Sequence, residues 1–459
     1  MFENFTSEYQ ELMVETLREL LKIESVKSHP LDGKPFGEGP SAALEYMLNL
    51  AESFGLRTKN VDGYAGHVEY GEGDDYIAAL SHLDVVPAGS DWTYPPFGAE
   101  IHNGKVYARG AIDDKGPAMS SLWALIALKK AGLVPKRKIR LIFGLDEESD
   151  WACMSHYFAK ERQPLGGFTP DSDFPLIYAE KGLVTFRVNV RAESELMGPR
   201  VIQFVGGSRV NMVPDHAYAV VECYSETAAY DWEQSLQKAA RSKQIEADIS
   251  VNGSQVHIVV HGVSAHASLP DKGRNAIMYL AALLGTKQIS NGTMWRAIGG
   301  QTTSGSELGI DCADDVSGAL TSNLGRAELT NGIFYFYFNV RYPVRLELND
   351  LTERCKHYLP DKWGVEVVES LPPLYVPLDS PVVQTLLRVY RDITGDYTEP
   401  FTIGGATYAR AIPNAVAFGA LYPGQADMAH QKDEYWSIDD YYRTVQIYAQ
   451  AMLDLANTL

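Results

Sequence analysis

The chain has 459 residues, 45% of them hydrophobic, and its 59 acidic and 40 basic residues give a formal net charge of −19. This length exceeds one ordinary hydrophobic core, so we expect two domains or one domain with a large insertion. The negative charge repels phosphate backbones and anionic lipids, which argues against nucleic-acid and membrane partners. It suits clustered carboxylates that hold divalent cations, but equally a surface that only aids solubility.

The four cysteines and the N-terminus bear on the compartment. Cys153, Cys223, Cys312 and Cys355 lie far apart without a C-x-x-C pair, so neither a disulfide framework nor a zinc ribbon is predicted. The first residues contain no basic segment followed by an apolar stretch, and no apolar run is long enough to span a bilayer. These features predict a soluble cytoplasmic protein with free thiols.

The first 182 residues have the pattern of a sheet wrapped by helices. Ser7 and Gln10 form a capping-box pair at the start of a predicted amphipathic helix, and a second helix is expected over 41–53. The apolar runs YIAAL, RLIFGL and PLIYA then alternate with a helical segment that has Pro117 in its first turn and Gly132 after its end. Residues 1–182 are therefore predicted to be α/β.

The pattern changes in the middle of the chain and returns near the end. Alternating strands such as TFRVNVRA, AYAVVEC, VHIVVHG and FYFYFNVRYP are interleaved with two helical segments, which is typical of α+β structure. After 377 come a helix, the strand AVAFGAL and a last helix capped by Ser437 and Asp440. We predict one α/β domain with a mixed, largely parallel sheet, formed by 1–182 and 377–459, and an inserted α+β domain formed by 183–376.

Two motifs in the first part of the chain contain candidate metal ligands. In SHLDVVP, alternation along a strand points His82 and Asp84 to the same face, where the carboxylate can support a metal-bound imidazole; a surface or core hydrogen bond is the alternative. In ARGAIDDKGP, Asp113 and Asp114 directly precede a predicted helix. They can be ligands there or simply cap that helix.

Three further sites follow strands or border them. Glu147 and Glu148 in GLDEESDW follow the buried strand IRLIF, although a solvated loop is the alternative. Asp171 precedes the strand PLIYA, and His430 follows the strand AVAFGAL. Ligands of open α/β sheets bind at the carboxyl ends of strands, so these side chains are expected to meet. Two histidines with several carboxylates and no cysteine favour zinc or a related ion over calcium, and their number suggests two ions bridged by a carboxylate.

With these motifs in order, the chain resembles a known family. The segments HLDVVP, GAIDDKGP, DEES, PDSDFP and MAHQKDE resemble the aminoacylase/carboxypeptidase G group of dinuclear zinc metallopeptidases, and DEESDW, EKGL, NMVPD, AHAS, NVRYP, GGATYAR and FGALYPGQADMAHQ are most similar to the bacterial PepV-type dipeptidases. The resemblance implies a catalytic domain with an inserted lid domain, the lid being 183–376. It also implies a monomer, because enlarged lids of this type replace the partner lid of dimeric relatives.

The resemblance also implies a role for each motif residue. His82 and Asp171 would bind one ion, Glu148 and His430 the other, and Asp113 would bridge both. Asp84 would orient His82, Glu147 would be the general base, and the peptide from Asp113 to Asp114 would be cis. In the lid, His266 and Asn211 would stabilise the oxyanion and Arg341 would bind the terminal carboxylate of the substrate. The residues near the substrate backbone would be Gly404, Gly405 and Thr407.

The predicted function is hydrolysis of unblocked dipeptides by a water activated between two divalent ions, most simply Zn²⁺, with Mn²⁺ and Co²⁺ as alternatives. Two other functions remain open. One is a deacylase or carboxypeptidase on the same scaffold that acts on N-acyl amino acids. The other is a non-catalytic protein that binds peptide or metal, which the presence of Glu147 beside a full ligand set disfavours.

Overall fold

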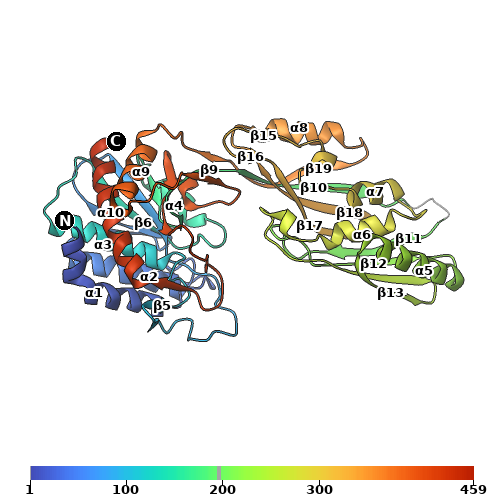
Figure 1. Ribbon diagram of the computed structural model, residues 1–459, viewed down its shortest axis with the longest axis horizontal. Helices are drawn as coiled ribbons and strands as arrows, with labels where there is room; N and C mark the ends of the chain where they lie inside the picture. Colours follow the sequence, from blue (N-terminus) through green and yellow to red (C-terminus); the bar gives the residue numbers. More distant parts are fainter. Residues whose placement is uncertain (1, 194–197) are drawn as a thin grey trace. The chain divides into compact units, whose positions relative to one another are not determined.

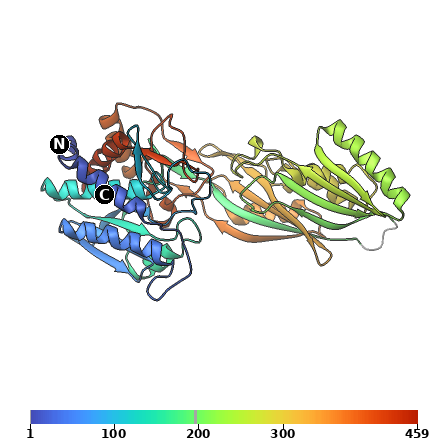
Figure 2. The same ribbon diagram turned by 90° about the horizontal axis from the view of Figure 1, so that it is seen from below.

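The computed structural model describes residues 2–193 and 198–459, which form two compact units. Unit 1 comprises the chain up to Ala179 together with Tyr375–Thr402 and Ala406–Leu459. Unit 2 comprises Glu180–Leu374 and the short segment Ile403–Gly405. Both chain ends belong to unit 1 (Figures 1 and 2). The predicted class, an α/β portion interrupted by an α+β portion, is confirmed.

Unit 1 contains a mixed sheet with helices on both faces. Its helices are α1 Phe2–Lys22, α2 Glu38–Ser53, α3 Lys115–Lys130, α4 Ala152–Lys160, α9 Pro381–Thr394, α10 Ile438–Thr458 and the 3-10 helix η3 Tyr408–Ala411. Its strands are β1 Arg57–Val61, β2 Ala65–Tyr70, β3 Tyr76–His82, β4 Glu100–His102, β5 Lys105–Tyr107, β6 Lys138–Gly144, β7 Gly166–Thr169, β8 Ser172–Asp173, β9 Ile177–Glu180, β20 Leu374–Tyr375, β21 Phe401–Ile403, β22 Ala415–Ala417, β23 Ala420–Leu421 and β24 Tyr435–Ser437.

The centre of this sheet is parallel. The strand order is β1-β2-β6-β3-β7-β22-β9-β20, with β21 beside β9. β3 is parallel to both β6 and β7, and β22 is parallel to β7. All seven residues of β3 are buried, as expected for a strand covered on both faces. The carboxyl ends of β3, β6, β7 and β22 therefore open onto one edge of the sheet.

Alternate residues of β2 show which helices cover which face. A side chain at Gly66 would collide with Leu44 of α2, whereas Nδ1 of the neighbouring His67 forms a hydrogen bond with the Tyr157 hydroxyl of α4. Successive strand residues point to opposite faces, so α2 and α4 lie on opposite sides. Helices α1, α3 and α10 pack on the side of α2 (Figure 1). Trp123 of α3 is fully buried and packs against Phe5 and Tyr9 of α1 and against Phe54, which follows α2.

Unit 2 is a second sheet with its own core. Its strands are β10 Gly182–Arg191, β11 Arg200–Gly206, β12 His216–Glu222, β13 Glu246–Asn252, β14 Gln255–His261, β15 Ala313–Asp314, β16 Gly318–Ala319, β17 Thr321–Thr330, β18 Ile333–Tyr342 and β19 Gly364–Leu371. Its helices are α5 Glu226–Lys243, α6 Ala276–Leu284, α7 Gly292–Gly299, α8 Leu348–Tyr358 and the 3-10 helices η1 Pro270–Lys272 and η2 Ser306–Leu308. The main sheet is antiparallel, in the order β13-β14-β12-β11-β17-β18-β10-β19.

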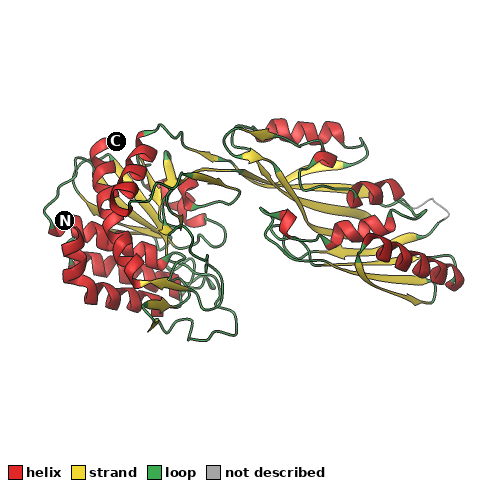
Figure 3. Cartoon of the chain, in the orientation of Figure 1, coloured by secondary structure: helices red, strands yellow, loops and turns green. Residues whose placement is uncertain are grey.

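The helices of unit 2 share one core with one face of this sheet (Figure 3). Phe334, Phe336 and Phe338 alternate along β18 and face Trp295 of α7 and the buried residues of α5, α6 and α8. The intervening tyrosines of β18 are only half-buried, which is the pattern of a sheet with one covered face. Within the described residues of both units, no helix is both long and apolar enough to cross a membrane.

The structure differs from the sequence prediction in three elements. The first helix begins at Phe2, and Ser7 is inside it, where its hydroxyl donates to the Glu3 carbonyl instead of capping the helix. Asp171 follows a strand that the sequence did not reveal, β7, whose residues GGFT lack the usual apolar run. The strand expected over AVAFGAL is divided into β22 and β23, with a cis peptide between Gly419 and Ala420.

Candidate metal centre

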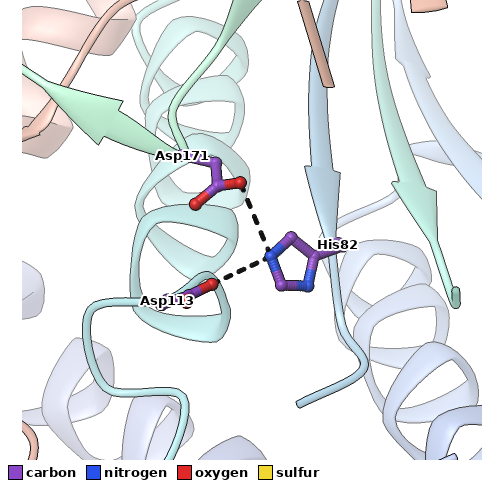
Figure 4. Close-up of side chains that lie close together, drawn as sticks. All are labelled: His82, Asp113 and Asp171. Atoms are coloured by element: carbon purple, nitrogen blue, oxygen red, sulfur yellow. Dashed lines mark hydrogen bonds and ion pairs between the residues drawn. The ribbon is translucent and has the colours of Figure 1, made fainter. Parts of the chain in front are cut away.

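His82, Asp113 and Asp171 form the first of two groups of possible ligands (Figure 4). The His82 Nε2 lies 3.0 Å from Asp113 Oδ1 and 3.7 Å from Asp171 Oδ2. His82 is fully buried, and the side chains of Asp113 and Asp171 are 14% and 19% exposed. The three ligand atoms therefore converge on one point at the edge of the buried sheet.

Asp113, Glu148 and His430 form the second group. The His430 Nε2 lies 3.0 Å from Asp113 Oδ2 and 2.9 Å from Glu148 Oε1. Each oxygen of the Asp113 carboxylate thus faces a different histidine, Oδ1 toward His82 and Oδ2 toward His430. Two ligand groups that share one carboxylate are the arrangement that two bridged ions require.

The parallel strands bring these residues together. His82 is the last residue of β3 and pairs with Gly144, the last residue of β6, so Glu148 follows at the same edge. Asp171 follows β7, the other neighbour of β3. Asp113 directly precedes the Asp114–Lys115 start of α3, and its peptide bond to Asp114 is cis, as the family resemblance implied. His430 arrives from the loop after β23 with a positive φ of 62°.

Asp84 connects the first histidine to the two glutamates. The Nδ1 of His82 lies 2.9 Å from the Asp84 backbone carbonyl and 3.5 Å from its carboxylate, so the carbonyl is the closer partner. The carboxylate instead accepts the backbone N–H groups of Glu147 and Glu148, each at 3.1 Å. Asp84 thus fixes the His82 ring by one group and the loop after β6 by the other.

Glu147 and Glu148 have different surroundings. Glu148 belongs to the second ligand group and is 13% exposed, whereas Glu147 belongs to neither group of the described chain. Burial raises the pKa of Glu147 well above its usual range, and the charge of His82 opposes this shift while the carboxylates of Asp171 and Glu148 add to it. A carboxylate of raised basicity beside the ligands is suited to accept a proton from water.

The pKa values within the groups reflect crowded negative charge. Burial, followed by the charge of Asp113, raises the pKa of Asp171 to about 7. Hydrogen bonds to Asp113 and Glu148 raise the pKa of His430 to about 11. Burial disfavours a charged His82, but its contacts with Asp113 and Asp84 outweigh this and raise its pKa. Positive charge is therefore favoured at both groups.

Two acids within these motifs, Asp114 and Asp146, make structural contacts. Asp114 stands at the N-cap position of α3 without a side-chain capping bond; its carboxylate accepts the backbone N–H of His82 at 3.0 Å. Asp146 is fully buried and binds Lys27 at 2.7 Å and the backbone N–H of Ala152 at 3.0 Å, at the start of α4. The sequence left open that Asp113 and Asp114 only cap a helix and that Glu147 and Glu148 lie in a solvated loop. The contacts of these segments match neither alternative.

A buried ion pair that no local sequence pattern predicted contacts the backbone at Asp113. Arg109 Nη1 lies 2.6 Å from Glu434 Oε2, and both side chains are almost fully buried. The other oxygen of Glu434 accepts the backbone N–H groups of Ile112 and Asp113, at 3.0 and 3.3 Å. Arg109 also donates to the carbonyl of His430 at 3.4 Å. One ion pair thus links the backbone at Asp113 to the backbone at His430.

The remaining predicted site residues lie mostly on unit 2. The backbone N–H of Ala267 donates to the Asn211 carbonyl at 2.9 Å, which places Asn211 beside the loop of His266. Arg341 is buried and donates from Nε to Asn339 and from Nη1 to the Gly404 carbonyl, each at 3.0 Å. Gly404 and Gly405 belong to unit 2, whereas Thr407 belongs to unit 1 and caps η3 through the N–H of Ala409.

The donor set of the two groups fits divalent ions such as zinc. Ligands at zinc–nitrogen and zinc–oxygen distances around a tetrahedral ion lie about 3.3 Å from one another. The neighbouring ligand atoms here are 2.9 to 3.7 Å apart. The groups contain imidazole and carboxylate and no thiolate, which suits zinc, manganese or cobalt.

Comparisons with known proteins identify the family. Residues 78–454 match the peptidase family M20/M25/M40. This chain belongs to that family. A Bacillus subtilis relative, "Putative dipeptidase YtjP", is 40% identical over 97% of this chain and 98% of its own. The M20/M25/M40 chain is therefore a metallopeptidase, a hydrolase, and its family is one of dinuclear metal enzymes.

Solved structures agree on the fold of this family member. Human carnosine dipeptidase 1 is 14% identical, covers 99% of this chain and 98% of its own, and has a TM-score of 0.59. The dipeptidase Dug1p of Saccharomyces cerevisiae is 12% identical, covers 99% of this chain and 98% of its own, and has a TM-score of 0.57. At these identities the likeness concerns the fold alone.

Proposed function

We propose that this chain is a dipeptidase that hydrolyses unblocked dipeptides with two bound divalent ions, most simply Zn²⁺. One observation carries the proposal: the two carboxylate oxygens of Asp113 face His82 and His430 at 3.0 Å each, so two nitrogen- and oxygen-containing ligand groups share one bridge. The names of the full-length relatives support the dipeptide substrate.

In this proposal each ligand group holds one ion. His82 and Asp171 bind one ion, Glu148 and His430 bind the other, and Asp113 bridges them. Asp84 orients the His82 ring through Nδ1 and holds the loop of the two glutamates. The Arg109–Glu434 pair holds the backbone that carries the bridge.

Glu147 is the proposed general base. When bound, the two ions polarise a water molecule and the scissile carbonyl and so lower the barrier to attack. Glu147 accepts a proton from that water and later donates it to the leaving amine. Its position outside the ligand groups leaves its oxygens free of the metal.

Unit 1 is the proposed catalytic domain and unit 2 the proposed lid. On the lid, His266 and Asn211 stabilise the oxyanion of the tetrahedral intermediate and Arg341 binds the terminal carboxylate of the dipeptide. Gly404, Gly405 and Thr407 lie near the substrate backbone. The adjacency of Asn211 to the His266 loop and of Gly404 to Arg341 supports this grouping.

The test is a hydrolysis screen with added Zn²⁺, Mn²⁺ or Co²⁺. We expect turnover of free dipeptides and little turnover of the same dipeptides with an acylated amino group. Cleavage of acylated substrates alone would instead identify a deacylase or carboxypeptidase. Binding of metal and dipeptide without any turnover would indicate a non-catalytic protein.

Light scattering of the same preparation tests the predicted monomer, and fractionation of cells tests the predicted cytoplasmic location.

A further inference from the structure

The ring of His266 is held at one nitrogen by a nearby serine. Ser268 Oγ lies 2.6 Å from His266 Nδ1, and the backbone N–H of Ser268 also donates to this nitrogen, at 3.3 Å. His266 is solvent-exposed, and it belongs to the same loop as the half-buried Ser268. Both contacts lie within unit 2.

The backbone contact shows which ring nitrogen accepts in this geometry. A backbone N–H can only donate, so Nδ1 accepts through its lone pair here, but a contact of 3.3 Å is weak and does not by itself exclude the other tautomer. In a neutral imidazole whose Nδ1 accepts, the single proton is on Nε2. The hydroxyl of Ser268 can donate to the same lone pair, and at 2.6 Å it is the closer donor.

We propose that Ser268 is a positioning residue that fixes the Nε2–H tautomer of His266, so that this ring always presents a hydrogen-bond donor to the substrate. The inference rests on the proposed function, in which His266 stabilises the oxyanion. An oxyanion needs a donor, and the other tautomer would present a lone pair to it. Ser268 therefore acts on the reaction only through His266.

The Ser268 hydroxyl is not needed to hold the loop. The loop is fixed by backbone bonds: the N–H of Val213 donates to the Ala265 carbonyl, that of Ala267 to Asn211, and that of Leu269 to His266. The hydroxyl adds only the contact with the ring. A purely structural role for the serine does not explain this contact with the ring, whereas the proposed role requires it.

Neighbouring groups favour the neutral ring that this tautomer requires. Partial desolvation lowers the pKa of His266, and the positive charge of Arg341 lowers it further. A protonated ring would also place a hydrogen on Nδ1 against the N–H of Ser268. Gly404 contributes space, because a side chain there would come within 3.3 Å of the Ser268 Cβ.

The tautomer can be measured by NMR of the full-length protein labelled with ¹⁵N-histidine. The chain has 11 histidines, and the His266 signals are assigned by their absence in His266→Gln. We expect the wild type to show an unprotonated Nδ1 and a protonated Nε2. In Ser268→Ala a share of the Nδ1–H tautomer should appear, and kcat should fall about 3- to 10-fold with little change in KM. Removing a whole oxyanion donor lowers kcat by about 10²- to 10³-fold, and the loss here is smaller because part of the rings keep the Nε2–H tautomer.

Ser264 provides the matched control in the same loop. Its hydroxyl donates to the Val213 carbonyl at 3.3 Å and does not contact the ring. Ser264→Ala should leave both the tautomer and kcat unchanged. His266→Gln, whose amide N–H reaches toward the Nε2 position, should retain more activity than His266→Asn, whose amide reaches only toward Nδ1.

Three results would overturn the inference. These are an Nδ1–H tautomer in the wild type, an unchanged tautomer and kcat in Ser268→Ala, and greater activity of His266→Asn than of His266→Gln. Failure of the proposed function is recognised separately, because the NMR measurement needs no substrate. If the wild type cleaved no dipeptide, the function would be wrong whatever the tautomer, and the catalytic role of Ser268 would fail with it.

Discussion

Glu147 and Glu148 are adjacent in sequence, but only Glu148 faces a histidine of the ligand groups. We expect Glu147→Gln to retain about two ions per chain and to lose turnover by about 10²- to 10⁴-fold, the usual contribution of general acid–base catalysis. Elemental analysis and dipeptide kinetics measure the two effects. The matched change Glu148→Gln should instead lower the metal content. Undiminished turnover in Glu147→Gln would remove it from the mechanism.

The two histidines are expected to differ in which ion they hold. His430→Ala should weaken binding of the ion shared with Glu148, and His82→Ala that of the ion shared with Asp171, whereas Asp113→Ala should weaken binding of both. Each histidine variant keeps two carboxylates in its group, so binding is weakened without being abolished and the metal should be titrated at limiting concentration. Two tightly bound ions in His430→Ala would exclude that residue from the centre.

The sequence predicts the kinds of residues at this site better than their contacts. All five proposed ligands were identified in motifs, because parallel strands gather their carboxyl ends at one edge. The buried pair of Arg109 and Glu434 was missed although both residues lie within those motifs. They are 325 positions apart in the chain, and no local pattern indicates a partner at that separation.

Among the structural elements, the segment before α3 and the loop of His430 depend on one ion pair. Glu434→Ala should lower the free energy of unfolding by about 3–5 kcal/mol, because Arg109 would remain buried without its partner. Glu328→Ala, in the more exposed pair with Arg326, is the control and should cost about 1 kcal/mol or less. Urea denaturation in the presence of a chelator measures both. Equal effects would show that loss of the buried Arg109–Glu434 pair costs no more stability than loss of the exposed Arg326–Glu328 pair.

Strand β2 contains a histidine that makes stability depend on pH. His67 is buried beneath α4, where its Nδ1 forms a hydrogen bond of 2.8 Å with the Tyr157 hydroxyl. Burial, followed by the charge of Arg140, lowers its pKa to about 4. Between pH about 6.5 and 4, His67 is therefore protonated in the unfolded chain but neutral in the folded protein. The free energy of unfolding should fall as pH falls through this range, by up to about 1.4 kcal/mol per pH unit.

The comparison of His67→Gln with wild type tests this pH dependence. The wild-type free energy of unfolding should decrease more steeply between pH 6.5 and 4 than that of the variant, as measured by urea denaturation. The exposed His29 is the control, and His29→Gln should retain the wild-type slope. A slope unchanged in His67→Gln would mean that another group titrates.

The helices and strands that the sequence predicts correctly have strong periodic patterns. Helix α9, for example, has proline at its start and an apolar face, and β18 alternates phenylalanine and tyrosine. Strand β7 was missed because GGFT has two glycines in four residues, yet it is completely buried between β3 and β22. It forms a strand because it pairs with strands that are distant in the sequence, and local residue propensities do not report such pairing.

For the whole molecule, the division of the chain follows the change in strand pattern. Alternating half-buried strands begin at β10, where unit 2 begins, and the apolar strands of unit 1 resume after it. All five proposed ligands and Glu147 belong to unit 1, although they come from segments separated by the whole of unit 2. Assembly of the metal centre therefore requires both sequence portions of unit 1 to be folded together.

This distribution predicts how metal removal affects each unit. Ions that bind only the folded centre stabilise it by about 4 kcal/mol at a thousand-fold excess over Kd, and their removal leaves Asp113, Glu148 and Asp171 to repel one another. Chelation should therefore increase hydrogen exchange at the ends of β3 and β6 and at the start of α3, while the core of β10 and β18 keeps its protection. Exchange measured by mass spectrometry at one pH distinguishes the units.

Asp113→Asn with metal present should resemble the chelated wild type. Equal loss of protection in unit 2 would mean that its stability also depends on the ions, contrary to the distribution of the ligands.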